Sequence, residues 1–315
     1  QMRYLCNHPE ALQPLVSQYQ SVADPDLMAR AAQRVHDTWD ASQFYRQLVS
    51  DAGHDASPAT FESLAGRSGL ISGSVSVPGP FTKRGWETAV KPRIEGYRKL
   101  VKRDLVLQDV FHGAPPDLAG DVLALYAKDY SAHWAAFLDG VTLRQPNDMG
   151  AAAEMLATLS KGDSPLFKLM RAVRDQTQLG AASGTPLAGV AKDFAMLRDF
   201  FETAGGGGEK ALGFVQRLLP GRDKGVDALD RTQSASAKYQ FYLQQAQQAI
   251  NKAAQPGAPA ANIRNLMASG DDTTNPLRAL AAFAASFSTD YAGAVGADPT
   301  ARLLGSPIGG AKAAV

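Results

Sequence analysis

The sequence is poor in the residues that most often mark a chemical site. Cys6 is the only cysteine, so an intramolecular disulfide is excluded and cysteine pairing gives no information on the cellular compartment. The five histidines lie far apart: His8, His36, His54, His112 and His133. None has a second His or Cys at the spacing that metal ligands take. We therefore expect neither a metal site nor a cofactor.

Charge excess and long apolar runs are also absent. The chain has 32 Lys and Arg against 31 Asp and Glu, and we find no basic stripe of the kind that phosphate backbones require, so nucleic acid is not expected as a partner. The most apolar run, 279–287, is much shorter than the ~20 residues of a membrane-spanning helix. No signal-peptide pattern opens the chain at Gln1, and we expect a piece of a longer protein.

Helix signals recur through the chain, whereas two-residue alternation is scarce. The pattern predicts an all-α fold, an elongated and irregular array of helices with at most a few short strands. The predicted helices are 26–50, 83–103, 115–141, 148–160, 164–178, one through Val190, Phe194, Leu197 and Phe201, 226–254 and 275–291. No repeat of 20 to 50 residues with matching landmarks supports a solenoid.

Residues that cap or break helices refine this prediction at three places. Residues 72–80 are rich in Gly, Ser and Pro and predict an extended crossing, in which Val75 and Val77 form a short strand. Thr82 is expected to cap the helix that follows. Pro92 should kink or split that helix near Ala89.

The predicted organisation has two helical parts and a tail. We expect an N-terminal helical subdomain at 1–112, a C-terminal helical subdomain at 113–290, and a loosely ordered tail at 291–315 that leads to an absent β-sandwich domain. The glycine run Gly205–Gly208 reads as a linker. It is not a phosphate loop, because an acid stands before Lys210 where that loop needs glycine.

Two carboxylates are the strongest candidates for chemistry. Glu62 precedes Ser63, as the acid of helical peptidoglycan-cleaving enzymes precedes a serine, but the favoured interpretation is a solvent-facing acid in the first turn of a short helix. Asp129 lies among Tyr126, Tyr130 and Trp134 and is expected at the edge of this stripe in a hydrogen bond or ion pair. We predict no catalytic, cofactor-binding or metal-binding residues.

Three segments carry a family resemblance. Residues 77–86 (VPGPFTKRGW) form an aromatic, glycine-containing loop, residues 125–138 (LYAKDYSAHWAAFL) an aromatic helix, and residues 159–173 (LSKGDSPLFKLMRAV) a capped helix that 275–280 echoes. In this order they resemble signatures of the IcmF/TssM family of type VI secretion inner-membrane proteins. The helix at 125–138 is the most specific match.

The resemblance implies a role without catalysis. It places 24–307 in the periplasm of a Gram-negative bacterium, after the membrane anchor and before a β-sandwich, as a structural segment between the inner membrane and an outer-membrane lipoprotein. The partners it implies are TssL, TssJ and further copies of the chain. In the family TssJ docks mainly on the β-sandwich, so we do not expect this segment to bind TssJ, and the family's nucleotide-binding domain is not expected here.

Two alternatives stay open. One is a helical, lytic transglycosylase-like enzyme that uses Glu62, and the other is a helical adaptor of a different envelope system. The aromatic stripe Tyr126, Tyr130, Trp134 and Phe137 is interpreted as core rather than as a partner surface.

Overall fold

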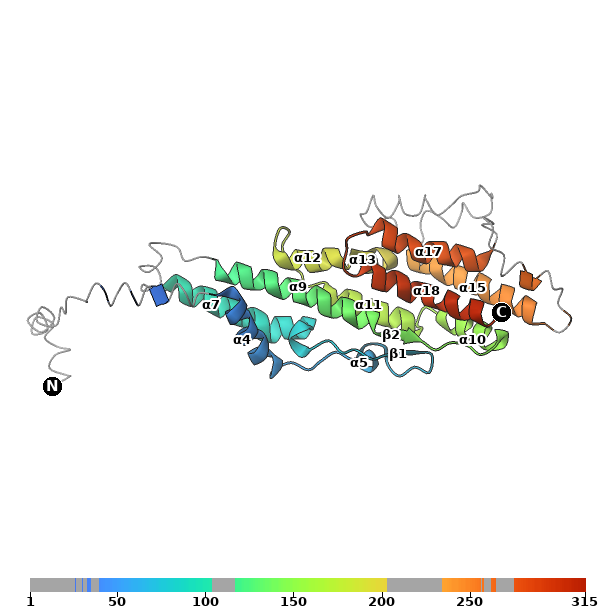
Figure 1. Cartoon of the computed structure of the whole chain (residues 1–315), viewed down its shortest axis with the longest axis horizontal. Helices are drawn as coiled ribbons and strands as arrows, with labels where there is room; N and C mark the ends of the chain where they lie inside the picture. Colours follow the sequence, from blue (N-terminus) through green and yellow to red (C-terminus); the bar gives the residue numbers. More distant parts are fainter. Residues whose placement is uncertain are drawn as a thin grey trace, which may run out of the picture.

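The computed structural model describes residues 40–103, 117–202, 234–255, 257, 262–264 and 275–315, together with 26, 30, 33 and 34. Within them the fold is helical, with one two-stranded sheet. Figure 1 shows an elongated stack in which α4 and α7 lie toward one end and α10, α15 and the C-terminus toward the other. The predicted all-α, elongated array of helices is confirmed.

The first part of the chain forms a layer of short helices. Its elements are α4 (Ala41–Gly53), α5 (Phe61–Ala65), η2 (Gly79–Phe81), α6 (Lys83–Gly85), η3 (Trp86–Val90) and α7 (Lys91–Arg103). The Asp40 carboxylate caps α4 by accepting a bond from the Ser42 N–H at 2.9 Å. Most of the predicted helix before residue 40 lies outside the described residues. Asp40 has an extended backbone, at φ −111° and ψ 115°, so the predicted helix 26–50 is interrupted there, and the part that begins at Ala41 ends at Gly53 rather than before it.

Pro92 splits its helix as predicted. The five residues of η3 form a π-helical turn, and α7 begins immediately after it, with Pro92 in its first turn. A proline has no N–H to donate to the preceding turn, and the wider π turn before it absorbs this interruption. The helical direction is therefore kept from Trp86 to Arg103 although the α-helical hydrogen bonding is not.

Helix α9 (Leu118–Asp139) is the central element, and it packs against α4, α12 and α18. The Gly120 N–H donates to the Asp117 carboxylate at 3.0 Å, which starts the helix. The side chains of the predicted stripe are all buried: Leu118, Val122, Tyr126, Tyr130, Trp134, Phe137 and Val141. The spacing of apolar residues thus predicted the inner face of α9 correctly, although Val141 lies just beyond the helix.

The small sheet differs from the predicted strand. It joins β1 (Ile71–Gly73) to β2 (Val141–Leu143) in antiparallel register, with Ile71 opposite Leu143. Val75 belongs to neither strand, and Val77 makes only an isolated bridge with Ala59. The prediction of a strand at Val75 and Val77 is therefore wrong, because the pairing partner that defines the strand lies after α9.

The rest of the described chain is a stack of helices: α10 (Met149–Leu159), α11 (Pro165–Thr177), α12 (Pro186–Asp193), α13 (Ala195–Phe201), α15 (Ala235–Ala254), α17 (Pro276–Asp290) and α18 (Ala297–Ala313). Side-chain caps at Asp148, Ser164 and Asn275 start three of them, at the residues where the predicted helices begin. The predicted single helix through Phe194 is two helices. Phe194 leaves the helical conformation between them, at φ −119° and ψ 22°, and its side chain is buried.

The predicted loose tail is also wrong. Residues 297–313 form α18, whose apolar side chains, Leu304 among them, are buried beneath α17 and α9. Pro307 lies inside this helix and cannot donate to the Leu303 carbonyl. The Ser306 hydroxyl donates to that carbonyl instead, at 2.7 Å. Arg302 fixes α18 to the C-terminal end of α9 through the backbone carbonyl and carboxylate of Asp139.

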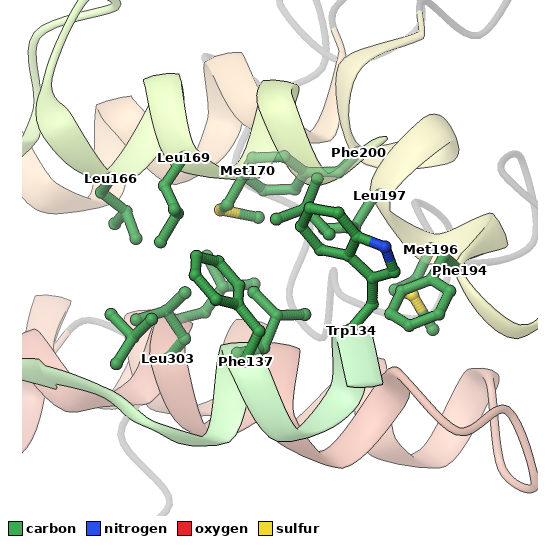
Figure 2. Close-up of a cluster of buried hydrophobic side chains, with 14 of the residues drawn as sticks. Trp134, Phe137, Leu166, Leu169, Met170, Phe194, Met196, Leu197, Phe200 and Leu303 are labelled. Carbon is green, nitrogen blue, oxygen red and sulfur yellow. The ribbon is translucent and has the colours of Figure 1, made fainter. Parts of the chain in front are cut away.

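One core runs through the stack. Figure 2 shows Trp134 and Phe137 of α9 facing side chains of α11, α13 and α18. The labelled members are Leu166, Leu169, Met170, Phe194, Met196, Leu197, Phe200 and Leu303. Phe200 continues this core toward α15 and α17 through Phe167, Tyr239 and Phe283, with ring centroids 5.9 to 6.4 Å apart. The stack is therefore held together mainly by apolar and aromatic packing.

Candidate functional site

The feature with the most specific geometry is the contact between the loop at Pro78–Thr82 and the aromatic face of α9, which we call the aromatic junction. The loop turns through η2, and Phe81 is buried. Thr82 caps α6, since the Gly85 N–H donates to its hydroxyl oxygen at 3.0 Å, and the same hydroxyl donates to the Gly79 carbonyl at 2.8 Å. This fixes the direction in which the chain leaves the loop.

Two glycines allow the backbones to approach at the aromatic junction. A Cβ atom on Gly79 would overlap the Ala56 carbonyl oxygen, and a Cβ on Gly85 would overlap the Gly79 carbonyl oxygen. In both cases the obstacle is backbone, which cannot rotate away as a side chain can. Any residue other than glycine at either position would therefore push the loop away from its neighbours.

Three aromatic side chains of α9 donate hydrogen bonds to backbone carbonyls. The Tyr126 hydroxyl donates to Pro80 at 2.7 Å, and the Trp134 indole N–H donates to Phe81 at 2.9 Å. The Tyr130 hydroxyl donates to the Gln176 carbonyl of α11 at 2.7 Å. These residues are four apart, so they share one face of α9. The face therefore holds the N-terminal layer and α11 with directed bonds as well as by packing.

Gln176 completes the aromatic junction from the side of α11. Its side-chain carbonyl oxygen accepts a hydrogen bond from the Lys83 backbone N–H at 2.8 Å, while its backbone carbonyl accepts from Tyr130. Gln176 therefore links α6, α9 and α11. Sequence reasoning missed it, because a single glutamine near a helix end carries no periodic signal.

Burial controls the protonation of the junction tyrosines. It raises the pKa of Tyr126 and Tyr130 well above the ordinary value, because a phenolate loses its hydration there. Coulombic interaction with Tyr130 raises the pKa of Tyr126 further. Both hydroxyls remain protonated donors at neutral pH, which suits structural hydrogen bonds rather than proton transfer.

Asp129 lies at the edge of the stripe in a hydrogen bond, as predicted. The Tyr45 hydroxyl of α4 donates to its carboxylate at 2.5 Å, which ties α4 to α9. His133 follows one turn later, with its ring centroid 4.3 Å from that of Phe81. Burial lowers the pKa of His133 below its ordinary value, while the Asp129 carboxylate opposes the shift. The Tyr45–Asp129 bond thus adds a directed polar contact between α4 and α9.

Glu62 has the surroundings of a surface acid. It lies in the first turn of α5, where Thr60 and Ser63 form a reciprocal cap, and its side chain is 67% exposed. Its carboxylate is 3.8 Å from the Arg67 guanidinium. The predicted solvent-facing position is confirmed, and the enclosed setting that an acid of glycan cleavage needs is not found around this side chain.

The other residues considered for chemistry divide between two groups. Cys6, His8, His36, His112 and the run Gly205–Gly208 lie outside the described residues. Of the described histidines, His54 is exposed and His133 packs on Phe81. In the part of the chain that the structure describes, no three His, Cys, Asp or Glu side chains are grouped for a metal ion. Nor does any helix there combine the length and apolar character needed to cross a bilayer.

The fold defines a class of helical protein with a long central helix that other helices cover on several sides. The aromatic residues of this helix bond the backbone of the same chain. The chain belongs to the IcmF-related family, described as intracellular multiplication and human macrophage-killing, whose model matches residues 2–178. The matched range contains the whole aromatic junction, from Ala56 to Gln176. The resemblance seen in the three sequence motifs is thereby confirmed.

The fold also has a counterpart among solved structures. It is similar to a chain of a "Type VI secretion system membrane core complex", with a TM-score of 0.53 and 19% sequence identity. The match covers 86% of this chain and 50% of the other, so this chain spans about half the length of that neighbour. No curated protein matches the chain in sequence.

Proposed function

We propose that this chain is a structural, non-catalytic segment of a type VI secretion membrane complex, located in the periplasm as a spacer and scaffold between the inner membrane and an outer-membrane lipoprotein. Family membership and the likeness of fold to a membrane core complex support this proposal. The observation that carries it is the aromatic junction. Its three most distinctive side chains are buried and donate their hydrogen bonds to the chain's own backbone.

This use of the aromatic residues favours a load-bearing role. A binding or catalytic site needs polar groups that face a ligand, whereas Tyr126, Tyr130 and Trp134 face carbonyl groups of their own chain. They join the N-terminal layer, α9 and α11, so that one part does not slide past another. We propose TssL and further copies of the chain as partners, and TssJ as a partner of the longer protein rather than of this segment.

The two predicted subdomains remain a proposal, with a refinement. Bonds from Tyr126 to Pro80, from Trp134 to Phe81 and from Tyr45 to Asp129 join 1–112 to 113–290. We therefore propose that the two segments fold as one unit. Expressed alone, 113–315 should lack cooperative unfolding, and adding 1–112 in trans should restore it.

The proposal is tested by assembly in cells. The full-length protein carrying Trp134→Ala should co-purify with markedly less TssL and fewer copies of itself than the wild type, because the scaffold is weakened at its centre. Glu62→Gln, an exposed change, is the matched control and should leave assembly unchanged. Normal assembly of the Trp134→Ala protein would contradict the scaffold role.

The enzyme alternative has its own test. Purified cell walls incubated with the wild-type chain should keep their turbidity if the chain has no glycan-cleaving activity. A loss of turbidity that Glu62→Gln abolishes would support the lytic transglycosylase-like alternative and overturn the proposed function. Failure to co-purify with type VI partners, without any cleavage, would support an adaptor of another envelope system.

A further inference from the structure

The near-zero net charge of the chain conceals one strongly basic segment. Residues 83–103 contain eight Lys and Arg and two Glu, a net charge of +6, whereas the whole chain has +1. The expectation was that the chain has no basic stripe of the kind that phosphate backbones require, and this segment departs from it. It corresponds to α6, η3 and α7, which follow one another directly along the chain as helical turns.

Helix α7 has a clear division of faces. Ile94 is buried, and Tyr97 lies against Phe44 of α4 with ring centroids 4.5 Å apart. Lys91 and Arg98 are exposed, and they are seven residues apart, so both lie on the solvent side of the helix. Ile94 and Tyr97 are thus used inside the protein, whereas Lys91 and Arg98 face outward.

The acids near α7 neutralise only part of this charge. Lys91 is 4.0 Å from Glu95, and Arg93 is 2.6 Å from Asp55. Arg98 and Lys99 are exposed, and no carboxylate among the described residues lies within ion-pair distance of them. Arg98 and Lys99 are therefore the cations of α7 that the nearby acids leave unneutralised among the described side chains.

The position of α7 makes this surface accessible. Figure 1 shows α7 toward one end of the elongated body, away from α10, α15 and the C-terminus. From Lys91 to Lys99 a helix advances by ~12 Å, so the exposed cations form an extended row rather than a point charge. Such a row on a helix fits a flat array of negative headgroups better than one small anion.

We propose that α7 is a docking surface for an anionic phospholipid bilayer, which it contacts by charge without inserting. The choice of a bilayer over another polyanion rests on the proposed membrane-complex function. Each basic residue near an anionic membrane strengthens binding about fivefold, so the row gives a weak and reversible contact that orients the body beside the membrane. Screening by salt should weaken it, because the charges are exposed.

Vesicle flotation tests this proposal without any secretion partner. The wild-type chain should float with vesicles of phosphatidylethanolamine and phosphatidylglycerol, not with vesicles of phosphatidylcholine alone, and added NaCl should release it. Arg98→Glu with Lys99→Glu should lower the fraction bound at least ~10-fold. The matched control, Lys161→Glu with Lys168→Glu, makes the same charge change at two exposed positions outside α7 and should bind like the wild type.

Several results would overturn the proposal. These are no binding by the wild type, equal binding to both kinds of vesicle, and an equal loss in the two double variants, which would indicate net charge alone. Tighter binding of duplex DNA than of anionic vesicles at the same salt concentration would reassign the surface to nucleic acid. Thermal unfolding of both variants shows whether each is folded. A failure here leaves the assembly test of the proposed function unaffected, because that test measures protein partners.

Discussion

The indole N–H of Trp134 donates a 2.9 Å hydrogen bond to the backbone carbonyl of Phe81, 53 residues earlier in the chain. Both residues are buried, so neither group has water as an alternative partner. The bond therefore fixes the position of the loop against α9 more strictly than packing of the rings alone. It also makes Trp134 the best single position for testing the aromatic junction.

Replacing Trp134 separates packing from hydrogen bonding. Trp134→Ala should lower the free energy of unfolding by about 3–5 kcal/mol, because it leaves a cavity in a closed core. Trp134→Phe keeps much of the ring but leaves the Phe81 carbonyl unsatisfied, and it should cost about 1–3 kcal/mol. Urea denaturation measures both, and Phe241→Ala, at an exposed aromatic residue, should change little. Wild-type-like unfolding of Trp134→Ala would place this side chain at the surface.

Glycine replacements test the close approach of backbones. Gly79→Ala should destabilise the fold by about 1–3 kcal/mol, because its methyl group meets the Ala56 carbonyl. Gly96→Ala in α7 is the matched control, since a Cβ there meets nothing within 4 Å. It should stabilise the protein by about 0.5–1 kcal/mol through helix propensity. Equal effects of the two changes in thermal unfolding would refute the steric account.

The shifted pKa of His133 predicts a dependence of stability on acid. Burial lowers the pKa of His133 in the folded state. Above pH 6.5, about the pKa of a histidine in the unfolded chain, the residue is neutral in both states and contributes fully to the free energy of unfolding. As the pH falls through 6.5, the unfolded chain takes up the proton first. The free energy of unfolding should therefore decrease from that pH down to the folded pKa.

Chemical denaturation between about pH 5 and 8 measures this dependence. His133→Gln should flatten the curve relative to the wild type, because glutamine does not titrate. His54→Gln, at an exposed histidine, should leave the slope as it is. A slope that persists unchanged in His133→Gln would assign the dependence to other groups.

The packing of α18 gives a prediction for the end of the described chain. Leu304 is fully buried, and its carbonyl accepts a 2.7 Å hydrogen bond from the Tyr239 hydroxyl of α15. Leu304→Ala should cost about 2–5 kcal/mol in urea denaturation, whereas Lys312→Ala on the exposed side of α18 should stay within about 0.5 kcal/mol. A negligible effect at Leu304 would mean that α18 does not belong to the cooperative core.

The sequence predicted buried faces better than it predicted contacts. The apolar spacing in α9 identified the side that is buried, and Thr82, Ser164 and Asn275 marked helix starts, because these signals are local. Which carbonyl each aromatic residue bonds is set by tertiary placement, so the role of Gln176 was not predictable from spacing.

Helix α18 shows that local sequence signals can also fail to predict a helix. Its many Gly, Ala and Pro residues resemble a loose terminus, and Pro307 alone would suggest a break. Helicity is recovered because Ser306 satisfies the carbonyl that Pro307 leaves free and because the apolar side is covered by α17 and α9. Local propensity is a weak guide where tertiary burial supplies the stabilisation.

The aromatic junction also sets an order in which contacts can form while the chain is being synthesised. Helices of this kind assemble quickly from neighbouring residues, but Tyr130 finds its acceptor on Gln176, 46 residues further along. A ribosome that has just released Trp134 has already supplied Phe81 and must still add Gln176. The N-terminal layer can therefore dock on α9 before the aromatic junction is complete. The bond from Tyr130 to Gln176 forms only after α11 has been synthesised.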